Sequence, residues 1–307
     1  MTAAVTTTAS ATTTRGAGRP SRRRSAVWLG LTPFAIYIIL FLAIPAILAV
    51  GSGFFTQAGS FTFANFSALA DPAVQSDYVG TLGLSAVTAI VGAIIGALIC
   101  LALLATNPNG ALRTIIDSAS SVLAQFGGVM LAFAFITLIG AQGLLTQWLV
   151  KAGLTSNVFN SFNHQGTLIY QVPGLAVPYL YFQIPLMVLT FMPAMEGLKA
   201  TWGEANATLG GTRFTYWTKI GFPILAPAFF GSVILLFANS FSSYATAAAL
   251  ISQGGLISLD IRGYINSETV VGHQNAAGVL ALLMVVTMVI VMVAYSMLER
   301  RASRWRR

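Results

Sequence analysis

Residue types that usually perform chemistry are few and scattered in this sequence. Its one cysteine, Cys100, lies in the middle of an apolar run, so it can form neither an intrachain disulfide nor a thiolate metal cluster. The two histidines, His164 and His273, have no Cys or second His nearby at metal-ligand spacing. No nucleophile–base pair stands out. We therefore predict no catalytic residues and no metal site, and we do not expect an enzyme.

Nucleotide-binding chemistry is also missing from the sequence pattern. There is no Gly-Lys pair, and a phosphate-binding loop of the Gly-Lys-Ser/Thr type requires one. We therefore expect no cofactor in this chain. If the chain moves a solute uphill, a partner must supply the energy.

The most informative pattern lies in the segment 196–223. Thr201-x-x-Glu204 is a capping-box spacing, which predicts the start of a short helix. Gly210-Gly211 predicts its end, because glycine adopts the left-handed conformation of a helix cap at little cost. The segment therefore predicts a short helix followed by a sharp turn.

A second short helix is predicted after this turn, from about Thr212 to Lys219. It would present Phe214 and Trp217 on one side. Pro223 then suits the first turn of the long apolar helix that follows. Apolar side chains that project from such a helix-turn-helix unit are typical of a partner-binding surface.

This segment resembles the signature of the permease subunits of binding-protein-dependent bacterial ABC importers. That signature reads Glu-Ala-Ala, three residues, Gly, nine residues, Ile-x-Leu-Pro. The spacing matches throughout, at Glu204, Ala205, Asn206, Gly210, Ile220, Phe222 and Pro223. Two positions depart, because Asn206 stands in the third alanine slot and Phe222 replaces leucine. The resemblance extends less specifically over residues 28–300.

The resemblance implies a coupling role for this loop, which in the family occupies a groove of the ATPase subunit. The implied ATPase-coupling residues are Glu204, Ala205, Asn206, Gly210, Phe214, Trp217, Ile220 and Pro223. It also implies the partners: two ATP-binding subunits that hold ATP and Mg, a second and different permease subunit, and an extracytoplasmic solute-binding protein. The alternative is that Glu204 merely caps a helix and Gly210 merely ends it.

The solute class is indicated only by the resemblance. Leu209-Gly210 in place of Asp-Gly, and the stretch from Asn239 to Thr246, are more similar to permeases for polyamines, phosphonates, ferric iron and thiamine than to sugar permeases. A small polar solute is therefore expected, with a sugar as the alternative.

Polar side chains recur in the fifth apolar run. Asn239, Ser242, Ser243 and Thr246 have the spacing i, i+3, i+4 and i+7, which places them on one face of a helix, with Tyr244 close beside it. A polar stripe in a membrane helix faces either a wet pathway or another helix. We name these five residues as pathway candidates, with interhelical hydrogen bonding as the open alternative.

The elements that must position these residues are membrane helices. Only 8% of the 307 residues are charged and 56% are hydrophobic, whereas soluble domains have about 25% charged residues. Crossing a bilayer takes about 20 apolar residues. Six stretches qualify, at about 28–53, 78–105, 118–140, 168–194, 222–251 and 276–298. The predicted fold is an all-α membrane protein, and Gly92-x-x-x-Gly96 in the second run predicts close helix packing.

Basic residues predict the topology of these spans. Of the 16 Lys and Arg residues, 14 lie in the two tails and in the loops after spans 2 and 4. Because cytoplasmic segments are enriched in Lys and Arg, both termini and the 196–223 loop are expected on the cytoplasmic side of a bacterial plasma membrane. We interpret 1–27 as a disordered basic tail, 28–300 as the transmembrane domain and 301–307 as a second basic tail. The apolar run after the first tail is too long for a signal peptide.

Two other classes of protein remain as alternatives. A secondary carrier or channel usually has ionisable groups at membrane depth, and none lies inside the six predicted spans, although sodium coupling through backbone carbonyls alone is compatible with the sequence. A membrane enzyme would need a convergent catalytic set.

The basic residues lie at the ends of apolar runs, so we expect the lipid bilayer rather than nucleic acid as their partner.

Overall fold

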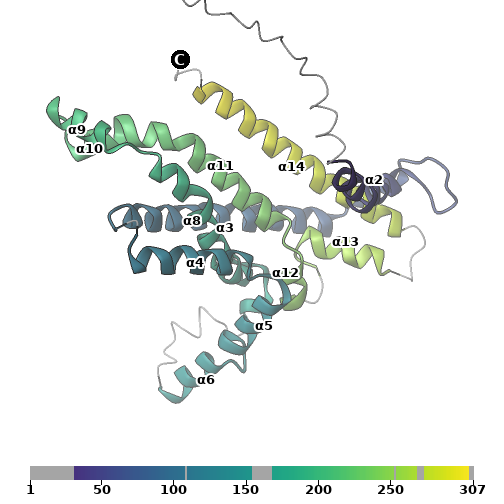
Figure 1. Cartoon of the computed structure of the whole chain (residues 1–307). Helices are drawn as coiled ribbons and strands as arrows, with labels where there is room; N and C mark the ends of the chain where they lie inside the picture. The colour runs from purple at the N-terminus through teal and green to yellow at the C-terminus, as the bar shows by residue number, and fades with distance from the viewer. Residues whose placement is uncertain (1–30, 108, 154–167, 252–253, 268–272, 304–307) are drawn as a thin grey trace, which may run out of the picture. The chain divides into compact units, whose positions relative to one another are not determined.

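A computed structural model describes residues 31–107, 109–153, 168–251, 254–267 and 273–303 (Figure 1). The predicted tail 1–27, His164 and residues 304–307 lie outside the described residues. The chain divides into two units, Met1–Ala49 and Val50–Arg307. The described residues form helices and connecting turns without a β-strand, as expected for an all-α protein.

The first unit contributes a helical, apolar segment with a π-helical turn. Its elements are η1 (Ile39–Ala43) and α2 (Ile44–Gly51), whose end reaches the second unit. The second unit contains, in chain order, η2 (Ser52–Phe54), η3 (Ala64–Ala70), α3 (Pro72–Leu104), α4 (Ala111–Gln125), α5 (Gly128–Ile139), α6 (Leu144–Lys151), η5 (Leu168–Tyr170), η6 (Val172–Leu175), α8 (Ala176–Glu196), α9 (Ala200–Thr208), α10 (Arg213–Tyr216), η7 (Trp217–Gly221), α11 (Phe222–Phe241), α12 (Ala245–Leu250), α13 (Ile257–Ile265) and α14 (His273–Ser303).

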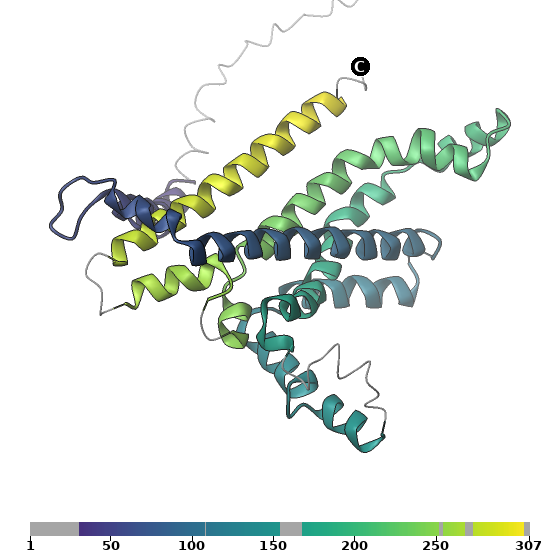
Figure 2. The ribbon, with the colours of Figure 1, turned by 180° about the vertical axis from the view of Figure 1, so that it is seen from behind.

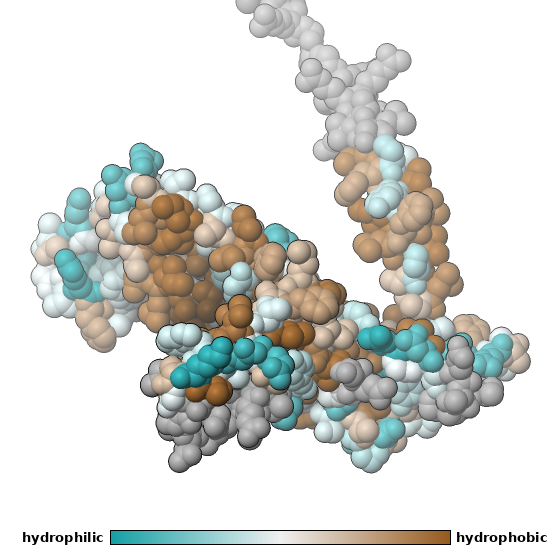
Figure 3. Space-filling view, turned by 90° about the horizontal axis from the view of Figure 1, so that it is seen from below, coloured by the Kyte–Doolittle hydropathy of each residue, from teal (hydrophilic) through white to brown (hydrophobic). Residues whose placement is uncertain are grey.

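Six helical segments among the described residues are long and apolar enough to cross a membrane, which confirms the predicted number. They are Leu31–Phe54, Pro72–Leu104, Gly128–Lys151, Val172–Glu196, Arg213–Leu250 and Gln274–Met297. Brown hydrophobic side chains cover large areas of the face shown in Figure 3, and teal hydrophilic ones form small groups. An exterior of this kind is solvated by lipid rather than water.

The third span differs from its predicted bounds of 118–140. That stretch is divided between α4 and α5 by a break at Phe126 and Gly127, and the apolar segment continues through α6 to Lys151. Gly128, the first residue of α5, has φ +71°, a conformation that glycine adopts readily and that lies outside the right-handed helical region, so α4 and α5 do not form one regular helix. The prediction of one helix over 118–140 was therefore wrong.

Helix α3 is the central element of the second unit. Pro72 occupies its first turn, and the Asp71 side chain accepts a hydrogen bond from the Ala73 backbone N–H at 2.9 Å. Helix α3 packs against α8 and α11, and α4 also packs against α8. Figures 1 and 2 show the region where α8 meets α3 and α4.

Gly92 and Gly96 lie where α3 meets α8. A Cβ atom added to Gly96 would lie 2.5 Å from Met187 Cβ, and one added to Gly92 would lie 3.1 Å from Gln183 Cβ. The absence of side chains at both positions therefore permits the close helix contact that the spacing predicts.

Candidate functional site

The α9–α10 loop contains the two short helices expected from the sequence. Gly210 has φ +75° and follows the end of α9. Its N–H donates to the Ala207 carbonyl at 3.0 Å, and the Gly211 N–H donates to the Asn206 carbonyl at 2.8 Å. These two hydrogen bonds form a Schellman motif, which satisfies carbonyl groups at the helix end.

The predicted start of the first helix was wrong by two residues. The helix begins at Ala200, with Lys199 at the N-cap position and no side-chain cap. Thr201 therefore lies inside the first turn and does not form a capping box with Glu204. The following Thr212 does cap α10, because its hydroxyl accepts a hydrogen bond from the Thr215 N–H at 3.2 Å.

Asn206, which departs from the family signature, links the two short helices. Its Nδ2 donates to the Thr212 carbonyl at 3.1 Å. The side chain lies so close to Gly211 that a Cβ atom there would overlap it. This asparagine therefore stabilises the turn, a role that its low helix propensity did not indicate.

The second short helix continues without interruption into the fifth span. Helix α10 is followed directly by η7 and then by α11, and Pro223 lies in the first turn of α11 as predicted. Leu209 and Phe214 are 88% and 78% exposed. Trp217 is partly buried and packs against the apolar cluster between α3, α8 and α11. The loop thus has an exposed apolar tip and a packed base.

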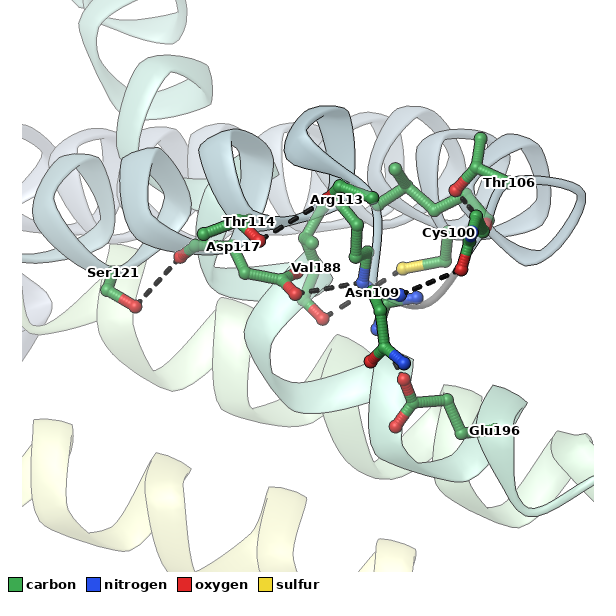
Figure 4. Close-up of polar contacts among 12 residues, drawn as sticks. Cys100, Thr106, Asn109, Arg113, Thr114, Asp117, Ser121, Val188 and Glu196 are labelled. Atoms are coloured by element: carbon green, nitrogen blue, oxygen red, sulfur yellow. Dashed lines mark hydrogen bonds and ion pairs between the residues drawn. The ribbon is translucent and has the colours of Figure 1, made fainter.

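An ion-pair network fixes the helix that precedes this loop. Arg113, on α4 and only 7% exposed, donates from Nε to Asp117 Oδ2 at 2.8 Å. Its Nη2 pairs with Glu196, the last residue of α8 (Figure 4). The hydrogen bond to Asp117 is the main cause that raises the pKa of Arg113 above its ordinary value. The network joins α4 to the point where the chain leaves the fourth span.

The pathway candidates do not share one helical face. Helix α11 ends at Phe241, and the chain bends over 242–244 before α12 begins. The Ser242 hydroxyl donates to the Ala238 carbonyl at 2.8 Å, a local bond that is typical of helix ends. The expectation of a continuous stripe was therefore wrong, because it assumed a helix that the chain interrupts.

The break in the fifth span contacts the break in the third. The buried Thr246 hydroxyl accepts a hydrogen bond from the Gly128 N–H at 3.0 Å and lies 3.2 Å from the Gly128 carbonyl. Tyr179 of α8 donates its hydroxyl hydrogen to the Ser243 carbonyl at 2.9 Å. Backbone groups released by the two breaks are thus satisfied inside the protein, as membrane depth requires.

The five pathway candidates are consequently divided by environment. Ser242 and Tyr244 are exposed, Asn239 and Ser243 are partly buried, and Thr246 is fully buried. The geometry gives Thr246 a helix-packing contact and leaves Ser242 and Tyr244 accessible. Their role in solute passage stays a prediction.

A buried polar cluster, which the sequence pattern did not indicate, lies at the contact of α3, α8 and α11. Gln183 donates from Nε2 to the Thr88 hydroxyl at 2.9 Å, and this hydroxyl lies 3.0 Å from that of Ser240. The Ser85 hydroxyl and Gln183 Oε1 are buried without a partner within the described residues. The sequence shows these polar residues inside apolar runs, which indicates helix packing. Which of them pair depends on how α3, α8 and α11 contact each other.

A pair of carboxyl groups lies at the opposite end of α3 from the α9–α10 loop. Asp77 Oδ2 accepts a hydrogen bond from the Gly255 N–H at 2.7 Å. Burial and the neighbouring carboxyl of Asp77 raise the pKa of Asp260 on α13 to about 7. Helix α3 begins at Pro72, before the predicted apolar run that starts at residue 78, so Asp77 lies on this helix. Among the described residues, no group of three or more His, Cys, Asp or Glu side chains is arranged to hold a metal.

The fold is that of ABC transporter permeases. The chain superposes on a chain of a bacterial ABC transporter involved in the import of the acidic polysaccharide alginate, with TM-score 0.69 and 16% identity, covering 91% of this chain and 96% of that one. A structure of the bacterial alginate transporter in complex with an alginate pentasaccharide-bound periplasmic protein gives the same TM-score. No protein-family model matches the chain.

Sequence comparison identifies the same class of protein. The chain is 25% identical over 217 residues to the sulfate transport system permease protein CysT of Escherichia coli (strain K12), covering 70% of this chain and 72% of that protein. It is 27% identical to CysW, a sulfate transport system permease protein of Synechocystis, covering 83% and 87%. For the spermidine/putrescine permease PotB of Haemophilus influenzae the identity is 22%, covering 78% and 81%. In sequence and fold the chain is thus similar to ABC importer permeases, and its apolar helical segments indicate a multi-pass protein of the bacterial inner membrane.

Proposed function

We propose that this chain forms part of the pathway of an ATP-driven importer and is coupled to ATPase subunits through the loop 204–223. The observation that carries the proposal is the continuity of α10, η7 and α11. A partner that grips the exposed loop would move the whole helix, because no flexible joint separates the loop from the span. ATP and Mg would be held by the partner, since this chain has no phosphate-binding loop.

The direction of this coupling follows from the two ends of the helix. One end carries the exposed Leu209 and Phe214, and the other ends at the break over 242–244. Movement at the loop would change the geometry of the break, where the third and fifth spans touch through Thr246 and Gly128. A solute pathway gated at this contact would therefore respond to the state of the ATPase.

The solute is proposed to be small and polar, and to be delivered by an external binding protein. The similar permeases are named for sulfate and for spermidine and putrescine. The polyamine class was among the solutes implied by the sequence resemblance, whereas sulfate was not. A second permease subunit is proposed to complete the pathway, and a fold neighbour occurs in a complex with a periplasmic protein.

A pull-down in mild detergent tests the coupling loop. The double variant Leu209→Glu/Phe214→Glu places charges on the exposed apolar tip without filling a packed position. We expect the ATPase to co-purify with the wild-type chain and its recovery to fall at least about tenfold with the double variant, which corresponds to about 1.4 kcal/mol of binding free energy.

Phe61→Glu is the matched control, because Phe61 is 63% exposed and lies in the predicted outer loop between the first two spans. It should leave ATPase recovery unchanged. Equal recovery with the double variant would refute the coupling role of this loop, and absence of an ATPase from every preparation would refute the importer function.

A further inference from the structure

A pocket with a largely apolar lining and several polar side chains opens beside the break in the fifth span. It has a volume of 420 Å³, within the range of small-molecule sites. Residues from the α11–α12 break, α13 and α14 line it, including Ser242, Tyr244, Ser258, Arg262, Asn266 and Met284. The pocket therefore combines Ser242 and Tyr244, the two exposed pathway candidates, with the cationic Arg262.

Helix α13 separates its acidic group from its basic group. Asp260 interacts with Asp77 of α3, whereas Arg262, two residues further along, lines the pocket. Residues two apart point to different sides of a helix. Arg262 forms no salt bridge within the part of the chain that the structure describes. Arg262 is the one charged residue among those that line the pocket, and the carboxyl groups of Asp71, Asp77 and Asp260 lie near the same helix outside the pocket lining.

The other polar groups of the pocket can donate hydrogen bonds. Hydroxyl groups of Tyr244 and Ser258 and the amide of Asn266 line the same pocket as the Arg262 guanidinium. Guanidinium with neutral donors is a combination that recognises small oxyanions, because the arginine forms charge-assisted hydrogen bonds and the hydroxyls satisfy the remaining oxygens. A cationic solute such as a polyamine would find no carboxylate among these residues.

We propose that this pocket is a transient site for a small oxyanion of the sulfate type, with Arg262 as its charge contact. The inference rests on the proposed transport function and specifies its solute class. Because the pocket adjoins the break that is tied to the α9–α10 loop through α11, an anion held there would lie next to the element that the ATPase is proposed to move.

The charge of the pocket can be measured by labelling a cysteine at Ser242. The native Cys100 is fully buried, so Ser242→Cys supplies the accessible thiol among the described residues. The full-length variant in nanodiscs of zwitterionic lipid is treated with an anionic or a cationic methanethiosulfonate reagent. The ratio of the two rates reports the local charge, because an altered thiol pKa affects both reagents alike.

We expect the anionic reagent to react about threefold faster or more, relative to its rate with a free thiol, than the cationic one. Arg262→Gln in the Ser242→Cys background should abolish this preference, and Arg262→Lys should keep most of it. Lys151→Gln, which removes an exposed cation at the end of α6, should have no effect. Added sulfate should slow labelling in the presence of Arg262 and not in its absence.

Three results would overturn the inference: no labelling at Ser242→Cys, an unchanged ratio with Arg262→Gln, or no protection by sulfate. The last result would show that Arg262 does not hold free sulfate in this pocket. The labelling uses the permease alone, so it does not depend on an ATPase. A failed pull-down with a positive labelling result would refute the coupling function only, and the reverse would refute only the anion site.

Discussion

At the residue scale, a few polar side chains hold interrupted backbone in place. Thr246 binds both backbone groups of Gly128, and Asn206 binds the Thr212 carbonyl across the Gly210 turn. Both residues satisfy backbone groups at places where a helix ends. Unsatisfied groups of this kind are costly in hydrocarbon, so Thr246 contributes more to the structure than its small size suggests, whereas the hydrogen bond of Asn206 holds an exposed turn.

Replacing Thr246 by valine tests the contact between the third and fifth spans. The change keeps the shape and removes the hydroxyl, so the Gly128 N–H loses its partner, at an expected cost of about 1–3 kcal/mol. Thermal unfolding in detergent should show a lower Tm. Thr137→Val is the control, because the Thr137 hydroxyl bonds only within its own exposed helix turn. Equal Tm values for the two variants would contradict the assigned role of Thr246.

The pair Asp77–Asp260 predicts a pH dependence of stability. The pKa of Asp260 is raised from 3.8 to about 7 by burial and then by Asp77. A carboxyl group whose pKa is higher in the folded than in the unfolded chain stabilises the folded chain while the group is protonated. Its stabilising contribution is therefore complete below about pH 3.8 and is lost as the pH rises through about 7.

The variant Asp260→Asn should remove this loss of stability with rising pH. We expect the Tm of the wild-type chain to fall between pH 6 and pH 8 more steeply than that of Asp260→Asn. Glu204→Gln, in the distant α9 helix, should keep the wild-type slope. Parallel slopes for the wild-type chain and Asp260→Asn would show that the pair does not control stability in this range.

At the element scale, the unit from α9 to α11 combines a turn with a long helix. The turn depends on Gly210, whose φ of +75° is unfavourable for other residues. The helix depends on the direct succession of α10, η7 and α11. A displaced turn would therefore misplace the exposed tip relative to the helix without unfolding the span.

Gly210→Ala should strain the turn by about 1–2 kcal/mol and reduce ATPase recovery in the pull-down. Gly203→Ala is a stringent control, because Gly203 lies within α9 and a Cβ atom there meets nothing within 4 Å. Alanine at this position should stabilise the helix by about 0.5–1 kcal/mol. A similar loss of ATPase in both variants would mean that any change in this loop disturbs binding, and that the turn conformation is not the determinant.

At the scale of the whole molecule, Arg113 connects the second inter-span loop region to the end of the fourth span. It is nearly buried, whereas its partners Asp117 and Glu196 keep about half of their side-chain surface exposed. Because Glu196 immediately precedes the coupling loop, this network fixes the base of the loop against α4. Similar sulfate and polyamine permeases can be examined for the same contact.

Arg113→Ala should lower the stability of the chain by about 1.5–3 kcal/mol, since it removes hydrogen bonds to charged groups. The partners remain accessible to water, so the larger penalty of a stranded buried charge is not expected. A denaturation series in mild detergent measures the effect. Lys151→Ala, which removes an exposed charge, is expected to change stability by less than about 0.5 kcal/mol. An effect of that small size for Arg113→Ala would rule out the anchoring role.

Local properties of the sequence determined the class of this protein. Six apolar runs, few charges and a glycine-centred loop of fixed spacing predicted the membrane helices and the paired short helices before α11. These features depend on hydropathy and on the conformational preference of single residues, which neighbouring elements change little. The Gly210 turn is the clearest case, because its φ of +75° is what glycine permits.

Only the tertiary structure decided where the helices break and which polar groups meet. The helices break at 126–127 and at 242–244. Contacts between residues far apart in the chain form there and elsewhere, as in the pairs Thr246–Gly128 and Arg113–Glu196. The pocket around Arg262 likewise forms from three separate elements. Hydropathy sums over a window and is insensitive to such contacts, whereas a polar group at membrane depth must find a partner that only the folded bundle provides.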